Sequence, residues 1–400
     1  MTTLDFEKLA QRVPRYTSYP PAPYFEEAVS ANTYANWLHS LRDGKSVSLY
    51  FHVPFCKEMC WYCGCNTVVV NRPDIIKSYV ETMKTEVERV SDAIGARIPC
   101  EHLHFGGGTP TMLESGDFAE LMAFVHERFE MTKDAELAIE IDPRTLTPTM
   151  ADTLADVGIN RASLGVQEFS PLVQKAVNRV QPFEMVKKAV EALRANGITQ
   201  IGFDLMVGLP HQTVDDIELT IEKSMWLQPD RLSVFAYAHV PWMKKHQRLI
   251  DFETLPSLEA RLAQAEAART SLATRGYQLI GMDHFARPFD KLAKAARAGT
   301  MRRNFQGYTT DQADALIGFG ASAIGAMPQG YIQNQVQVRA YMEAVRENGF
   351  ATVRGYALSE DDKLRRAIID QLMCTFALDL ETIEGAKGLT IGALGNAEEL

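Results

Sequence analysis

Short apolar runs alternate with longer amphipathic segments along the first 240 residues. Six runs rich in β-branched and aromatic residues predict strands at 46–51, 102–105, 136–140, 162–166, 201–206 and 231–235. Apolar residues at helical spacing predict helices near 73–93, 116–129, 148–157, 184–195 and 214–227. Gly158 and Gly197 follow two of these helices, and Asp117 and Thr213 are candidate caps of two others. The alternation predicts right-handed βαβ units, and therefore an α/β fold with a parallel sheet covered by helices.

Most of the unusual residues lie at or near the C-terminal ends of these predicted strands. A cysteine-rich loop follows the first strand, and the glycine run 106–108 follows the second. Glu140 ends the third strand, and Asp204 lies in the fifth. A barrel gathers such residues from many loops at one face, whereas an open sheet concentrates them at one switch point. The distribution favours a curled, partial barrel, although an open sheet stays possible.

The segments on either side of residues 46–240 have a different character. Residues 1–45 include a stretch, 14–21, that is too rich in proline for regular structure and too aromatic for a free linker, so we expect an arm laid on the surface. Residues 241–400 predict a mainly helical C-terminal domain, with helices near 257–275, 289–298, 336–347 and 360–376. The glycine-rich stretch 385–400 has no periodicity, and we expect it to be poorly ordered.

Composition and charge narrow the function classes. Of the 400 residues, 46% are hydrophobic and 23% are charged, as in ordinary globular proteins. The net charge of −10 argues against nucleic acid and anionic membranes as partners. The first residues do not resemble an export signal, and no run approaches the ~18 apolar residues of a membrane span. We therefore expect a cytoplasmic protein, and nothing indicates more than a monomer.

Four of the six cysteines lie close together, as Cys56, Cys60, Cys63 and Cys65. A disulfide framework is not expected in a long chain without an export signal, so the cluster predicts metal binding. Structural zinc usually takes ligands from two separated cysteine pairs, and the sequence has no second pair. A three-cysteine iron–sulfur site is therefore favoured over structural zinc or free thiols. A four-iron cluster held in this way keeps one iron open for another ligand.

The glycine run at 106–108 and two strand carboxylates are further candidates. The run lacks the spacing of a phosphate-binding loop, and a tight turn and a close approach to a ligand both stay open. Glu140 and Asp204 lie on strands that parallel sheets usually bury, where an unpaired carboxylate costs several kcal/mol. We interpret them as ligand-binding groups, with a structural salt bridge as the alternative.

Two basic groups depart from the acidic total. One runs from residue 287 to 303, and the other comprises Lys244, Lys245 and Arg248. Solvated surfaces explain most runs of this kind. The competing interpretation is recognition of a polycarboxylate by charge-assisted hydrogen bonds.

Taken together, the motifs resemble a known family. The spacing Cys-x-x-x-Cys-x-x-Cys after the first strand resembles that of the radical S-adenosylmethionine (SAM) enzymes. Within them, the chain from about residue 10 to about residue 380 resembles the oxygen-independent coproporphyrinogen III oxidases. The matching motifs are RYTSYP at 15–20, HVPFC at 52–56, CGCN at 63–66, GVQ at 165–167 and RNFQGYTT at 303–310.

This resemblance implies a partial (β/α)6 barrel with one 4Fe-4S cluster and two SAM molecules. It implies that Cys56, Cys60 and Cys63 bind the cluster, that SAM occupies its open iron, and that Cys65 is not a ligand. The implied contacts of the first SAM are Tyr50, Gly107, Glu140 and Ile324. Those of the second are Tyr62, Gly108, Thr109, Gln167, Arg179, Asp204 and Ala238. Tyr50 and Gln306 are the candidate catalytic residues.

The resemblance also implies a reaction and partners. Two propionates of coproporphyrinogen III are decarboxylated oxidatively to the vinyls of protoporphyrinogen IX in haem synthesis. A flavodoxin or ferredoxin is expected to supply the low-potential electron. We add the hypothesis that Arg15, Arg302 and Arg303 hold the substrate carboxylates and that the arm covers the substrate site.

The chain departs from the family pattern at its end, where the glycine-rich stretch does not resemble the usual continuation, so we expect a shortened C-terminal domain. A haem chaperone of the same superfamily is the main alternative. Such chaperones begin almost at the first strand and lack the Cys-Gly-Cys ending, whereas here about 45 residues precede that strand and Cys65 is present. A haem-degrading radical SAM methyltransferase is a second alternative.

Overall fold

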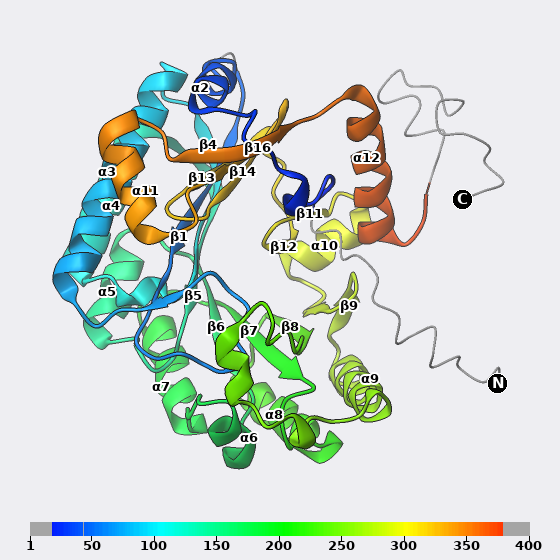
Figure 1. Ribbon diagram of the computed structural model, residues 1–400. Coiled ribbons are helices and arrows are strands. Elements are labelled where there is room, and N and C mark those ends of the chain that lie inside the picture. Colours follow the sequence, from blue (N-terminus) through cyan, green and yellow to red (C-terminus); the bar gives the residue numbers. More distant parts are fainter. Residues whose placement is uncertain (1–17, 43, 379–400) are drawn as a thin grey trace.

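Six parallel strands form the curved centre of the molecule (Figure 1). The computed structural model describes residues 18–42 and 44–378. Each of the six predicted strand ranges overlaps one of these strands. They are β1 (Val47–Val53), β4 (Pro99–Gly107), β5 (Glu130–Ile141), β6 (Arg161–Gln167), β7 (Gln200–Val207) and β8 (Arg231–Ala236).

Helices cover the outer side of these strands (Figure 1). The five predicted helices are α3 (Pro73–Ile94), α4 (Ser115–Arg128), α5 (Pro148–Asp156), α7 (Phe183–Ala195) and α8 (Val214–Trp226), and the short α6 (Pro171–Ala176) was not predicted. Thr213 caps α8 in a capping box, as expected. Asp117 lies in the first turn of α4 and not at its cap, which is Glu114. Gly158 and Gly197 adopt positive φ after α5 and α7, which ends both helices.

The sheet is an incomplete barrel. Among the described residues, its strand order is β16-β15-β14-β13-β1-β4-β5-β6-β7-β8-β10-β9. On one side β1 pairs in parallel with β13 (Ala315–Phe319), and on the other β8 pairs with β10 (His284–Ala286). These outer flanks do not pair with each other, so the described sheet stays open on one side. The prediction of a partial barrel is therefore confirmed.

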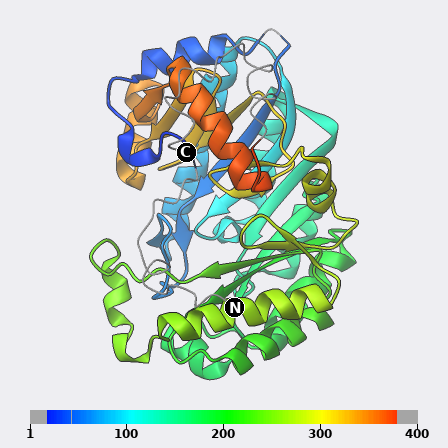
Figure 2. The same cartoon turned by 90° about the vertical axis from the view of Figure 1, so that its right-hand side faces the viewer.

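The segment after residue 240 contains the four expected helices and additional strands. The helices are α9 (Leu258–Thr274), α10 (Lys291–Ala298), α11 (Val338–Asn348) and α12 (Glu360–Thr375), and η3 (Lys245–Leu249) and η4 (Phe252–Thr254) precede them. The strands, besides β10 and β13, are β9 (Gln278–Ile280), β11 (Arg302–Asn304), β12 (Gly307–Thr309), β14 (Ile324–Met327), β15 (Gly330–Asn334) and β16 (Thr352–Ala357). Figure 2 faces the side where α12 and α9 lie in front of the sheet. The strands were not predicted, because runs of three to six residues carry little periodicity.

Residues 18–42 pack against the strands that end the sheet. They form η1 (Ala22–Tyr24) and α2 (Ala31–His39), which was not predicted. Phe25 stacks on Tyr331 of β15 at 5.6 Å between ring centroids, and Leu38 and Leu41 are fully buried. The proline-rich start up to residue 17 and the tail from residue 379, including the stretch expected to be poorly ordered, lie outside the described residues.

Aromatic packing and one buried carboxylate join the barrel to the C-terminal strands. The ring of Phe51 on β1 stacks between those of Phe105 and Phe319, at 4.7 and 4.8 Å. Glu86 on α3 accepts hydrogen bonds from the Gly320 N–H and the Tyr341 hydroxyl. Burial raises the pKa of Glu86 to about 7. None of the described helices combines the length and apolarity needed to cross a membrane.

Candidate active site

The cysteine loop, residues 56–66, lies between β1 and α3 at the C-terminal end of the barrel strands. Two short strands, β2 (Phe55–Cys56) and β3 (Val68–Val69), pair in parallel at its base. All of its cysteines are free thiols. The hydroxyl of Thr109, which follows β4, donates to the Cys56 sulfur at 3.7 Å. The loop is therefore held against the next strand end of the barrel.

Two guanidinium groups face the sulfur of Cys60. Arg144 Nη2 and Arg179 Nη1 each lie 3.4 Å from the Cys60 Sγ. Asp142, at the end of β5, holds both arginines through its Oδ2, at 2.7 and 3.1 Å. The two guanidinium groups therefore place positive charge directly beside one of the sulfurs of the cysteine loop.

The free thiols of the cysteine loop are the ligand type that an iron–sulfur cluster takes. A hydrogen bond with Cys65 lowers the pKa of Cys63 to about 6, whereas burial raises the pKa of Cys56 to about 11. Within residues 18–42 and 44–378, no three His, Cys, Asp or Glu side chains gather as ligands of one metal ion. A four-iron cluster is larger than one ion, so its ligand sulfurs lie further apart. The residues present thus suit the cluster that the cysteine spacing predicts.

The atoms around the glycine run, residues 106–108, leave no room for larger side chains. A Cβ atom on Gly108 would lie 2.7 Å from the Phe55 carbonyl oxygen, and one on Gly107 would lie 2.6 Å from the His52 ring. A Cβ on Gly106 would lie 2.8 Å from Glu140 Oε1. The run is therefore both a turn and a close approach, since the glycines let β4 end against the cysteine loop and against Glu140.

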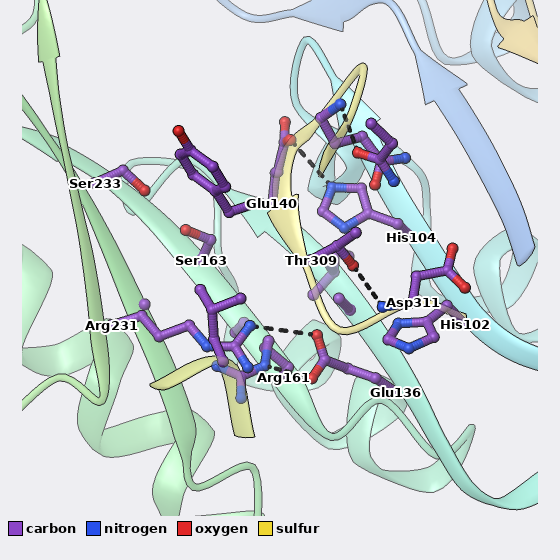
Figure 3. Close-up of a pocket in the computed structure, with 18 of the residues that line it drawn as sticks. His102, His104, Glu136, Glu140, Arg161, Ser163, Arg231, Ser233, Thr309 and Asp311 are labelled. Atoms are coloured by element: carbon purple, nitrogen blue, oxygen red, sulfur yellow. Dashed lines mark hydrogen bonds and ion pairs between the residues drawn. The ribbon is translucent and has the colours of Figure 1, made fainter. Parts of the chain in front are cut away.

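Inside the barrel, polar side chains line a cavity of about 200 Å³ (Figure 3). Glu140 Oε1 lies 3.1 Å from His104 Nε2, and Glu140 Oε2 accepts from the Gly107 N–H at 3.2 Å. Burial opposes ionisation of Glu140, but these hydrogen bonds outweigh it and hold the pKa below its usual range. The side chain stays 41% exposed towards the cavity, so it is available to a ligand.

Asp204 of β7 lines the same cavity, but its pKa is shifted in the opposite direction from that of Glu140. Its Oδ2 accepts a hydrogen bond from the Ser163 hydroxyl at 3.1 Å. Burial and the charge of Glu140 raise the pKa of Asp204 to about 6. Neither carboxylate forms a salt bridge with Arg or Lys among the described residues. Asp204 therefore has no salt bridge to a described residue, whereas the pairing of Glu140 with His104 leaves the structural alternative open for Glu140.

Tyr50 connects the cavity to the cysteine loop. Its hydroxyl lies 3.0 Å from His52 Nδ1, and His52 Nε2 lies 3.0 Å from the Asn66 carbonyl oxygen of the loop. Its ring also stacks on that of His104 at 5.9 Å. Gly318 pairs in register with Tyr50, and the Ile324 carbonyl packs against Gly318. Tyr50, Glu140, Gly107 and Ile324 therefore lie around the same end of the barrel.

The remaining SAM-binding candidates lie around the cysteine loop and the end of β6. Gln247 Nε2 donates to the carbonyls of Tyr62 and Ala238, at 3.1 and 3.2 Å, and so holds them together. Gln167 ends β6 with a φ of 64°, which is a strained conformation for this residue type. The buried Arg179 supports this strand end by donating to the Gly165 carbonyl at 2.6 Å.

The arginines expected to hold substrate carboxylates lie outside the barrel cavity. Arg302 and Arg303 line a second cavity of about 700 Å³ beside α12. Arg303 packs over the Tyr308 ring, and its buried Nε and Nη1 have no hydrogen-bond partner among the described residues. The two cavities share Asn304, Thr309, Asp311 and Leu316 in their walls, whereas Gln306 lines the barrel cavity. Arg15 lies outside the described residues.

Several residues of the site were not predicted from the sequence. Asp142 and Arg144 hold the surroundings of Cys60, and His104 contacts Glu140. Asp142 carried one signal, because it shares the inward face of β5 with Glu140 two residues away. Arg144 follows the strand in a turn, where the sequence contains no signal of its contact with a loop 84 residues earlier.

Comparisons with known proteins agree with this arrangement. The sequence profile of the radical SAM superfamily matches residues 50–223. The oxygen-independent coproporphyrinogen III oxidase of Bradyrhizobium diazoefficiens is 54% identical over 378 residues, which are 94% of this chain and 84% of that protein. The corresponding enzyme of Pseudomonas aeruginosa is 43% identical over 382 residues, covering 94% of this chain and 82% of the relative.

A solved structure extends the agreement to three dimensions. Coproporphyrinogen III oxidase (HemN) from Escherichia coli, described as a radical SAM enzyme, superposes with a TM-score of 0.91 at 40% identity. The match covers 95% of this chain and 87% of that one. Sequence and structure lead to the same assignment: the chain belongs to the oxygen-independent coproporphyrinogen III oxidases of the radical SAM superfamily.

Proposed function

We propose that this protein converts coproporphyrinogen III to protoporphyrinogen IX by oxidative decarboxylation of two propionates without oxygen. The observation that carries the proposal is the match over nearly the whole chain to enzymes named for this reaction, with 54% identity to one of them. The cavity of Figure 3 supports it, because Glu140 and Asp204 line it and Glu140 accepts a hydrogen bond from the glycine run that packs against the cysteine loop.

As a radical SAM enzyme, the protein uses a 4Fe-4S cluster and SAM, which together supply a 5′-deoxyadenosyl radical when bound. The chain's task is to bind, orient and shield these groups. We assign Cys56, Cys60 and Cys63 as the cluster ligands. Arg144 and Arg179 support this assignment, since their charges compensate the negative charge that the thiolates bring.

Two SAM molecules are part of the proposal, and their contacts divide between two groups of residues. For the first, Glu140 and the Gly107 backbone are already joined by a hydrogen bond, and Tyr50 and Ile324 lie beside them. For the second, Gln247 holds Tyr62 close to Ala238. Gln167 ends β6, Arg179 lies between α6 and α7, and Asp204 lies within β7. Gly108 and Thr109 lie between the two groups, against the cysteine loop.

The tetrapyrrole would lie against the second cavity, with a reacting side chain extended into the barrel. Arg303 supports this placement, because two of its buried N–H groups have no described partner and can donate to a carboxylate. Arg302 lines the same cavity. Ser18, the first described residue of the arm to which Arg15 belongs, lines it as well. Gln306 lines the barrel cavity, and Tyr50 stacks on His104 of the cavity wall, so both stay our catalytic candidates.

Anaerobic reconstitution with iron and sulfide, followed by incubation with SAM, a reductant and coproporphyrinogen III, tests the proposal. We expect protoporphyrinogen IX together with methionine and 5′-deoxyadenosine. Tight haem binding without turnover would instead favour the chaperone, and haem breakdown would favour the methyltransferase. A flavodoxin or ferredoxin as the physiological electron donor, a cytoplasmic location and a monomeric state are expectations that accompany this function.

A further inference from the structure

The segment after β8, residues 240–250, lies directly against the cysteine loop; we call it the basic segment. Lys244 Nζ donates to the Cys65 carbonyl at 2.8 Å, and His246 Nε2 lies 2.7 Å from the Cys63 carbonyl oxygen. The buried Gln247 donates to the Tyr62 carbonyl at 3.1 Å. The basic segment is thus fastened to the loop at three places, within and immediately beside the cluster-binding cysteines.

The outer surface of the basic segment combines exposed apolar side chains with positive charge. Met243 is 71% exposed and Trp242 is 56% exposed. Lys245 and Arg248 are exposed as well, and neither forms an ion pair with a described residue. The segment carries three Lys and Arg side chains and no acid in a chain whose net charge is −10, and Asp251 and Glu253 follow only in the next turn.

An exposed aromatic and methionine anchor flanked by positive charge is the composition of a protein interface. Positive charge selects an acidic partner and speeds its association. The cluster of this family has to receive an electron from outside the chain, and electron transfer falls steeply with distance, so a donor has to dock close to the cysteine loop. The basic segment is a surface of the required charge that touches this loop.

We propose that the basic segment is the docking surface for a small acidic protein that carries a low-potential, one-electron centre. This proposal rests on the proposed function in one respect, because both require the iron–sulfur cluster. In the step it serves, the carrier loses one electron and the cluster is reduced by one electron, from 2+ to 1+. No bond forms or breaks and no proton moves, so the surface has only to bring the two centres close together.

Charge reversal of the two exposed cations tests the proposal. The variant carries Lys245→Glu and Arg248→Glu, which leave the hydrogen bonds of Lys244, His246 and Gln247 in place. A matched control carries Lys133→Glu on β5 and Lys188→Glu on α7, two exposed cations that also form no ion pair with a described residue, with the same change of net charge. Reduced flavodoxin, an acidic flavoprotein, is the probe, and anaerobic stopped-flow absorbance follows reduction of the cluster.

We expect cluster reduction in the variant to be at least about tenfold slower than in the wild type at low ionic strength. The dissociation constant for oxidised flavodoxin should rise by a similar factor, and added salt should slow the wild type more than the variant. The control should behave like the wild type. Dithionite, which needs no docking, should reduce the cluster equally fast in all three proteins, and this shows that the variant is folded and loaded.

Equal flavodoxin affinity and equal reduction rates in the variant and the control would overturn the proposal. Loss of binding to vesicles rich in phosphatidylserine, with reduction by flavodoxin unchanged, would overturn it as well, because the surface would then serve a membrane. Failure of the proposed function is distinguishable: the wild type would form no protoporphyrinogen IX with dithionite, although the reduction measurements would still give their answer.

Discussion

Glu140 and Asp204 line one cavity, yet the surroundings shift their pKa values in opposite directions. Hydrogen bonds from His104 and Gly107 outweigh burial and lower that of Glu140, whereas burial and the charge of Glu140 raise that of Asp204. Both residues could be selected from the sequence, because carboxylates are unexpected on strands of a parallel sheet. The difference between them could not, since it depends on partners from other strands.

These shifts predict opposite effects of the amide substitutions on stability. The pKa of Asp204 is about 6 in the folded protein, so its ionisation destabilises the fold increasingly as the pH rises from about 4 to 6. Without SAM, D204N should therefore be more stable than the wild type at pH 7.5, by on the order of 1–2 kcal/mol. This gain should vanish as the pH falls to about 4, and urea unfolding at both pH values measures it.

E140Q is the partner variant, with the opposite sign. Because the folded pKa of Glu140 is lowered, its ionisation contributes stability above the usual carboxyl pKa, and this contribution is lost as the pH falls. E140Q should be less stable than the wild type at pH 7.5. Both variants should bind SAM more weakly. Destabilisation by both variants at pH 7.5 would contradict this account of the cavity.

Gly108 and Gly116 offer a matched pair for a second prediction. In G108A the new Cβ would meet the Phe55 carbonyl at 2.7 Å, so the cysteine loop would have to move. We expect reconstituted G108A to retain less than about half of the wild-type iron and sulfide, since cluster ligation needs the loop in place. Gly116 lies in α4 with open space around it, and G116A should keep the iron and gain about 0.5–1 kcal/mol of stability. Full iron content in G108A would show that the close approach is not required.

At the scale of elements, a buried ionic network joins three barrel strands to the segment before α10. Arg161 of β6 contacts Glu136 of β5 at 3.1 Å and Asp290 at 3.3 Å. Arg231 of β8 contacts Asp290 at 2.7 Å. Figure 3 shows Arg161 and Glu136 at the floor of the cavity. Burial opposes ionisation of Glu136, but Arg231 and Arg161 outweigh it and lower its pKa to about 2.

Breaking this network should be costly. R161A leaves Glu136 and Asp290 without one of their charge partners in a buried place, and we expect a loss of about 3–5 kcal/mol in urea unfolding at pH 7. Arg339 forms an exposed pair with Glu343 on α11, which solvent screens, so R339A should cost far less stability than R161A. If the two variants lost similar stability, the network would contribute no more than a surface pair.

The success of prediction also differed between elements. The six barrel strands and their helices were predictable, because long runs repeat their apolar residues with a clear period. β13 and the strands around it were not, although Ile317 and Phe319 are fully buried beside β1. A strand of five residues looks like a loop until its partner is known.

At the scale of the whole molecule, the boundary expected near residue 240 does not separate two independent cores. β13 pairs with β1 over five residues, and Phe319 completes an aromatic stack with Phe51. We therefore expect the fragment 46–240 not to fold alone, because one edge of β1 would be left unpaired and apolar. A fragment covering 18–378 should fold, and hydrogen exchange and thermal melting compare the two. A cooperative thermal transition of the 46–240 fragment would show that residues 46–240 fold as an independent domain.

The local chemistry and the succession of barrel strands and helices were predictable from the amino-acid sequence alone. Cysteine spacing, the glycine run and the alternation of strands and helices are local patterns, so they could be interpreted without a structure. Which side chains meet, such as Arg144 with Cys60 or the basic segment with the cysteine loop, depends on how the chain packs in three dimensions. The two residues of the first contact are separated by 84 positions in the sequence, and those of the second by 179 positions. A local sequence pattern contains no information about contacts between residues so far apart in the chain.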